Sequence, residues 1–225
     1  MTDLGELYAA ARHRITDLLM SSPEGAAMAI CPATPEWTVR DVVAHLRGIT
    51  EDVRTGNLAG VATDPWTAAQ VARHSDDSVE ELLTGWAEDA QLLEGVLSSP
   101  QGESVGRAVI DIYTHEADIR GALSRPAPMT LDFADWAIPV AGGNVCAEIA
   151  ASGLPPLRIV TSEGDDVGPA DAPVVLTIQR FELFRAVLGR RSREQVLDYD
   201  WGGADGAPYL SHLFIFGPRD GALVE

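Results

Sequence analysis

The first 125 residues carry four apolar stripes with helical spacing, each about 18 residues long and each ended by a helix breaker. The first stripe runs from Thr2 to Met20, and the others are predicted to begin at Thr38, Ser78 and Ser104. A long connection rich in Gly, Ala, Thr, Asp and Pro, residues 58–77, precedes the third stripe. Four such helices predict a four-helix bundle, a fold that builds metal sites from side chains on facing helices.

Two of the predicted helix starts are fixed by local capping signals. Thr38 is followed three residues later by Asp41, and Ser78 by Glu81. In this arrangement each side chain accepts a hydrogen bond from the backbone N–H at the other position, which satisfies two of the free N–H groups at the helix start. A helix that starts at Thr38 carries His45 two turns in, on a defined face.

Side chains with metal-ligand chemistry lie on the second and fourth predicted helices. Asp111 and His115 lie one helical turn apart, and Asp118 follows on nearly the same face. With His45 from a facing helix, Asp111 and His115 would supply the three protein ligands of a zinc site with one open position. The alternative is an ordinary hydrogen-bonded surface pair and a satisfied core histidine. His74, in the long connection, has no partner at ligand spacing and is expected to be solvated.

The pattern changes after Pro126, which predicts two domains, residues 1–125 and 126–225. The second part is predicted to hold helices over 135–152 and 181–189 and strands over 157–161, 174–178 and 195–201, with a hairpin turn at 164–168. The whole chain is therefore assigned to the α+β class, with a helical bundle followed by a small α+β domain.

Composition excludes some partners and indicates a compartment. The formal net charge of −18 and the pI near 4.5 argue against nucleic acid and against an anionic membrane surface as partners. Two distant cysteines predict free thiols, and no membrane-spanning run or signal peptide is recognised. We therefore expect a cytoplasmic protein; the sequence makes no prediction of its oligomeric state.

Two segments carry a resemblance to a known family. Residues 35–46, PEWTVRDVVAHL, and 111–123, DIYTHEADIRGAL, resemble the mycothiol-dependent maleylpyruvate isomerase family of actinobacteria. The resemblance implies a DinB-like four-helix bundle at the N-terminus. It also implies that His45 and His115 bind a metal, with Asp111 where the isomerase has a glutamate. Residues 181–192 resemble the second domain of that family, an α+β unit similar to sterol-carrier proteins.

The resemblance implies a chemistry and leaves two hypotheses open. A divalent metal, zinc being the best candidate, would activate mycothiol as a thiol cosubstrate for addition to, or transfer onto, a small electrophile. Arg185, Arg190 and Arg191 are candidates for binding the carboxylates of thiol or substrate, with Arg190 and Arg185 foremost. The second hypothesis is a non-catalytic small-molecule binding protein on the same scaffold, in which Asp111 does not support metal chemistry.

Overall fold

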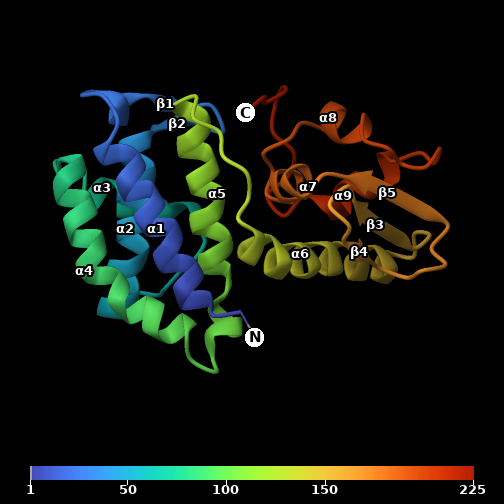
Figure 1. Cartoon of the computed structure of the whole chain (residues 1–225), viewed down its shortest axis with the longest axis horizontal. Helices are drawn as coiled ribbons and strands as arrows, with labels where there is room; N and C mark the ends of the chain where they lie inside the picture. Colours follow the sequence, from blue (N-terminus) through green and yellow to red (C-terminus); the bar gives the residue numbers. More distant parts are fainter. Residues whose placement is uncertain (1) are drawn as a thin grey trace. The chain divides into compact units, whose positions relative to one another are not determined.

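The computed structural model describes residues 2–225, which divide into two compact units, residues 2–127 and 128–225 (Figure 1). The first unit is helical with one small β-ribbon, and the second combines helices with a three-stranded sheet. The predicted α+β class is therefore confirmed. Among the described residues, no helix combines the length and the apolar composition that crossing a membrane requires.

Four long helices form the body of the first unit, and a shorter one covers α2 (Figure 1). Helix α1 packs against α4 and α5, while α2 packs against α4, α5 and the shorter α3, so α1, α4, α2 and α5 close a ring around one core. Trp86 and Tyr8 are fully buried in that core, where the Trp86 indole N–H donates to the Tyr8 hydroxyl at 3.3 Å. The helix bounds are α1 Leu4–Met20, α2 Val39–Thr55, α3 Asp64–Arg73, α4 Val79–Leu97 and α5 Arg107–Ala122.

Both predicted capping boxes are present. The Thr38 side chain accepts from the Asp41 backbone N–H while the Asp41 carboxylate accepts from the Thr38 backbone, and Ser78 and Glu81 make the same reciprocal pair. Helix α2 consequently starts where the sequence predicted. The predicted fourth helix is interrupted: a 3₁₀ turn, Gly102–Val105, precedes α5, which begins only after Gly106.

The expectation of an unstructured connection over residues 58–77 was wrong. Residues 64–73 form α3, and of its side chains only Gln70 is buried. A helix with one buried polar side chain has no apolar stripe, so hydrophobic periodicity does not reveal it. The short strands β1, Ile30–Cys31, and β2, Thr34–Thr38, pair antiparallel ahead of α2 and were also not predicted.

The second unit is built on a sheet of order β4-β3-β5 (Figure 1). Strands β3 (Leu157–Thr161) and β5 (Val174–Ile178) match the predicted ranges and pair in parallel. A hairpin joins β3 to β4 (Asp166–Val167), but its turn spans residues 162–165, because part of the turn predicted at 164–168 is strand β4. Helix α6 (Leu131–Ser152) packs on the sheet and on α7 (Arg180–Val187), where the rings of Phe133 and Phe184 meet edge to face at 5.2 Å.

One predicted strand of the second unit was wrong. Residues 193–197 form the short helix α8, capped by Ser192 and Gln195, and only Asp200 makes a bridge to the sheet, opposite Thr177. The capping pair satisfies the backbone N–H groups of Ser192 and Gln195 and so favours a helix start at this point. The chain then forms a 3₁₀ turn, Ala207–Tyr209, and the short helix α9, Leu210–Leu213.

Candidate metal centre

His45, Asp111 and His115 meet between α2 and α5. The Nε2 atom of His45 lies 3.6 Å from Asp111 Oδ2. The Nε2 atom of His115 lies 3.6 Å from the other carboxylate oxygen, Oδ1. One ligand atom from each residue lies within 4.8 Å of the other two. Both imidazoles are 5% exposed, whereas the Asp111 side chain is 36% exposed. The cluster is therefore buried on its histidine side and open to solvent at the carboxylate.

The His45 ring is oriented by a residue that the sequence did not indicate. Its Nδ1 lies 2.8 Å from Oε1 of Gln70, whose own amide nitrogen donates to Asp52 Oδ2 at 2.8 Å. Because a carboxylate only accepts, Gln70 must turn its nitrogen toward Asp52 and its oxygen toward His45. A neutral His45 ring therefore carries its proton on Nδ1, and its Nε2 lone pair then faces Asp111.

The His115 ring is oriented by a carboxylate one turn away. Asp118 is fully buried, and its Oδ2 accepts from His115 Nδ1 at 3.0 Å. His115 thus also presents its Nε2 lone pair to Asp111. The Asp118 carboxylate fixes this imidazole through its Nδ1 atom, which is the usual arrangement for a metal-binding histidine.

This donor set fits a divalent cation. Two imidazole lone pairs and one carboxylate point at a common space, and the distances of 3.6 Å are too long for hydrogen bonds. Tetrahedral zinc with bonds of about 2.0–2.1 Å separates its ligand atoms by roughly 3.4 Å. A cation of this size would need only a small inward movement of the three side chains.

Trp37 lies beside both imidazoles. Its ring centroid is 5.3 Å from that of His45 and 6.1 Å from that of His115, and the two histidine rings stand edge to face at 5.1 Å. Strand β2 and the Thr38 cap together place the indole there. In the sequence, Trp37 is only one residue of the segment 35–46, so its place beside both imidazoles is a finding of the structure.

The arginines predicted for substrate binding lie in the second unit. Arg185 is fully buried and forms a two-pronged ion pair with Glu225, and its Nε lies 2.8 Å from Oε2. Arg191 is also buried and contacts both Glu182 and Glu225. Arg190 is half-buried and donates to the Leu188 carbonyl. These contacts give Arg185 and Arg191 a structural role, while the catalytic roles of Arg190 and Arg185 stay predictions.

His74 was expected to be solvated, and this was wrong. It is 4% exposed, with Nδ1 2.9 Å from Asp77 Oδ2 and Nε2 3.2 Å from Glu51 Oε2. Glu51 comes from α2, 23 positions away, and could not be found from spacing, whereas Asp77 follows His74 by three positions and could have been. His74 therefore ties the end of α3 to α2.

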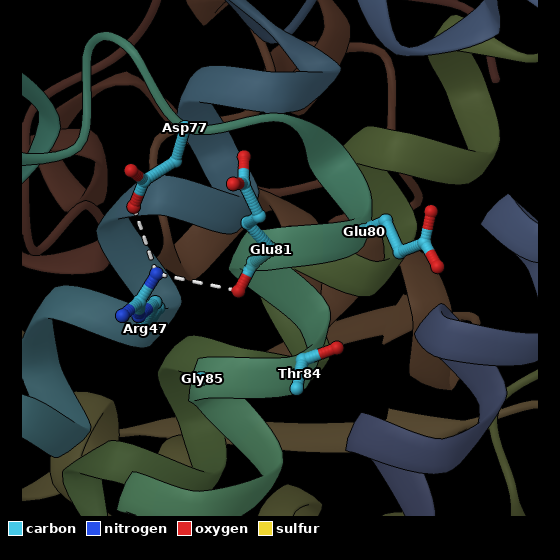
Figure 2. A pocket seen from close by; sticks show the side chains of 6 residues that line it. All are labelled: Arg47, Asp77, Glu80, Glu81, Thr84 and Gly85. Carbon is cyan, nitrogen blue, oxygen red and sulfur yellow. Dashed lines mark hydrogen bonds and ion pairs between the residues drawn. The ribbon is translucent and has the colours of Figure 1, made fainter.

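A shallow polar depression of about 510 Å³ lies on α2 and α4, away from the three candidate ligands. Figure 2 shows the Arg47 side chain, which donates to the Asp77 carboxylate at 2.8 Å and to the Glu81 carbonyl at 3.3 Å. Glu80 and Thr84 also line the depression. With its cation already engaged, this depression offers weaker chemistry than the cluster of His45, Asp111 and His115.

Comparison with known families gives one match. Residues 8–122, slightly more than half of the chain, match the family model of the mycothiol maleylpyruvate isomerase N-terminal domain. The matched range runs from α1 to the end of α5 and so includes all three candidate ligands. No curated protein and no solved structure matches the chain.

Proposed function

The chain belongs to the mycothiol maleylpyruvate isomerase N-terminal domain family, and on this premise we propose that it is a mycothiol-dependent metalloenzyme acting on a small electrophile. His45, His115 and Asp111 would hold the metal, with zinc as the proposed ion. The observation that carries the proposal is the convergence of both Nε2 atoms on one carboxylate. Family membership supports a low-molecular-weight thiol as cosubstrate and a cytoplasmic location.

The proposed chemistry is that of an activated thiol. A divalent ion bound by these three residues supplies positive charge that lowers the pKa of a thiol at its open position. In an isomerisation the sulfur adds to one carbon of a conjugated double bond, and the electron pair of that bond moves onto the conjugated carbonyl. Rotation about the resulting single bond and expulsion of the sulfur restore the alkene without consuming thiol. In a transfer, the new C–S bond forms as a leaving group departs with its electron pair.

The chain's own residues have three tasks in this proposal. Gln70 and Asp118 hold the two imidazoles with their lone pairs inward. Trp37 covers the rings and limits access of water, while the exposed side of Asp111 leaves an approach for the thiol. Arg190 and Arg185 remain the proposed cations for carboxylates of thiol or substrate, although Arg185 would first have to leave Glu225.

Metal content tests the proposal directly. Purified wild-type protein, incubated with zinc and passed through a desalting column, is expected to retain about one equivalent by elemental mass spectrometry. His45→Ala and His115→Ala should lose the metal, whereas His13→Ala, a change at an exposed histidine of α1, should retain it.

Turnover then separates an enzyme from a binding protein. Zinc-loaded wild type is expected to accelerate the reaction of mycothiol with an activated alkene, and His45→Ala should not. Wild type that binds no zinc would overturn the metalloenzyme proposal and favour the non-catalytic small-molecule binder.

A further inference from the structure

One face of α2 carries three residues that act together. His45, Gly48 and Asp52 are three and four positions apart and share this face. Gln70 of α3 lies across it and touches all three: its amide oxygen meets His45 Nδ1, its amide nitrogen meets Asp52, and its Cβ lies over Gly48. The side chains of Gln70 and Asp52 are 0% and 1% exposed, so water cannot replace these contacts.

We propose that Asp52 and Gln70 are positioning residues that set the tautomer of His45 and thereby make its Nε2 a metal ligand. The proposal deepens the function proposed above and rests on it for the identity of Nε2 as the ligating atom. Asp52 does not touch His45; it acts through the orientation of the Gln70 amide.

The hydrogen bonds that link Asp52 to Gln70 and Gln70 to His45 are called the relay below. Its direction follows from which groups can donate a hydrogen bond. Oδ1 of Asp52 accepts from Arg73 Nη2 and from Asn57 Nδ2, both at 2.9 Å. The remaining oxygen, Oδ2, accepts from Gln70 Nε2. The amide oxygen of Gln70 is then the group that faces the imidazole, and only a protonated Nδ1 can donate to it.

Distance decides which tautomer of His45 is favoured. A proton on Nδ1 makes a hydrogen bond of 2.8 Å to Gln70, whereas a proton on Nε2 would face the Asp111 carboxylate at 3.6 Å, beyond hydrogen-bonding range. A buried Nδ1 without its proton would also leave the buried Gln70 oxygen without a donor, which is unfavourable. The relay therefore keeps Nε2 unprotonated.

The two histidines differ in how their tautomers are set. Asp118 faces His115 directly, and a carboxylate accepts in either orientation. The Gln70 amide, in contrast, can turn by 180° and exchange its acceptor for a donor. His45 is consequently the imidazole whose tautomer depends on a distant residue, and His115 is an internal control.

An isosteric change at the far end of the relay should invert it. In Asp52→Asn, the new amide oxygen can still accept from Arg73 and Asn57, and the new amide nitrogen then faces Gln70. Gln70 has to turn its oxygen toward position 52 and its nitrogen toward His45. His45 can pair with that nitrogen only through an unprotonated Nδ1, which moves its proton to Nε2 and blocks the ligand atom.

A second change should restore the original polarity. In the double variant Asp52→Asn with Gln70→Glu, the carboxylate at position 70 accepts from the amide at position 52 and from His45 Nδ1. The proton returns to Nδ1 and Nε2 is again a ligand. A role in packing alone does not predict that a second substitution in the core repairs the first.

The experiment reads the tautomer of the metal-free protein by ¹⁵N NMR of its imidazoles, at a pH where His45 is neutral. We expect His45 to be protonated on Nδ1 in wild type, on Nε2 in Asp52→Asn and on Nδ1 again in the double variant, with His115 on Nδ1 throughout. Zinc affinity, measured by chelator competition, should fall about 10–100-fold in Asp52→Asn and recover in the double variant.

The outcomes separate this inference from the proposed function. An Nε2 proton on His45 of wild type, or an unchanged tautomer in Asp52→Asn, overturns the relay even if zinc binds. If the tautomers change as expected but wild type binds no zinc, the relay stands and the metalloenzyme proposal fails. If Asp52→Asn does not fold, the test uses the wild-type protein and Gln70→Leu. The leucine cannot accept from His45 Nδ1, so the preference of His45 for a proton on Nδ1 should be lost, and an unchanged tautomer would overturn the relay.

Discussion

Gly48 of α2 and Gln70 of α3 are in direct contact, so close that a Cβ built on Gly48 would lie 2.5 Å from the Cβ of Gln70. No side chain larger than hydrogen fits at this position without moving α3. The glycine thus sets the approach of the two helices, and with it the reach of Gln70 to His45.

Gly48→Ala is expected to displace α3 and to weaken both the fold and the metal centre. Crowding in a packed core costs about 1–3 kcal/mol, which exceeds the gain of up to ~1 kcal/mol from replacing a helical glycine. The matched control is Gly95→Ala in α4, where nothing lies within 4 Å of the added methyl group and stability should rise. Urea unfolding and zinc affinity measure both effects; a Gly48→Ala protein as stable as Gly95→Ala would contradict the close packing.

The sequence predicted the parts of the centre that follow from local rules. Thr38 and Asp41 fixed the start of α2 and so the face on which His45 lies, and the four-residue interval of Asp111 and His115 placed both on one face of α5. The supporting residue Gln70 could not be predicted in this way. Its helix buries only that one polar side chain, and the hydrogen bonds that fix it span 25 and 18 positions of sequence.

The wrong strand in the second unit has a different cause. The apolar alternation around Val196 favoured a strand, but Ser192 and Gln195 form a capping box that begins α8. The capping signal was present in the sequence and outweighs alternation over so short a segment. Strands β3 and β5 were predicted correctly because each is a run of β-branched and aliphatic residues bounded by turn residues.

Cys31 should make the first unit sensitive to alkaline pH. Its side chain is fully buried, and burial, followed by the negative charge of Asp118, raises the pKa of the thiol from 9.0 to about 12. Because the folded pKa is the higher one, the unfolded state loses its proton first, and this contribution to stability is full below about pH 9 and is lost as the pH rises toward 12.

The test compares urea unfolding of wild type and Cys31→Ala at about pH 8 and about pH 10. The variant is expected to be less stable at the lower pH because it loses packing, but its free energy of unfolding should fall less between the two pH values. Equal falls in the two proteins would show that the Cys31 thiol does not contribute to the alkaline transition.

Asp165 should make the second unit sensitive to acid. Hydrogen bonds from Arg180, at 2.6 and 2.7 Å, and from the Thr161 hydroxyl lower the pKa of its carboxyl below the usual 3.8. The folded pKa is the lower one, so this contribution is present above about pH 4 and is lost as the pH falls through the folded value.

Asp165→Asn removes the charge and is expected to lower stability near neutral pH while reducing the further loss on acidification. Asp171→Asn, a change at an exposed aspartate of the same unit, should leave the acid dependence unchanged. Thermal unfolding of the three proteins between about pH 6 and pH 3 supplies the comparison. An Asp165→Asn curve parallel to that of wild type would assign the acid sensitivity to other carboxylates.

Substitutions of Arg185 and of Arg190 should show which arginine stabilises the fold and which one binds substrate. Arg185→Met leaves the buried Glu225 carboxylate with Arg191 as a remaining contact, and breaking a buried ion pair costs about 3–5 kcal/mol. Arg190 is half-buried, so Arg190→Met should cost less than about 1 kcal/mol. If Arg190 binds a carboxylate of thiol or substrate, its variant should raise KM at nearly unchanged stability. Denaturant unfolding and KM, measured for both variants, decide the assignment. An Arg185→Met protein with wild-type stability but a raised KM would assign substrate binding to Arg185. It would also refute a structural role for the ion pair of Arg185 with Glu225.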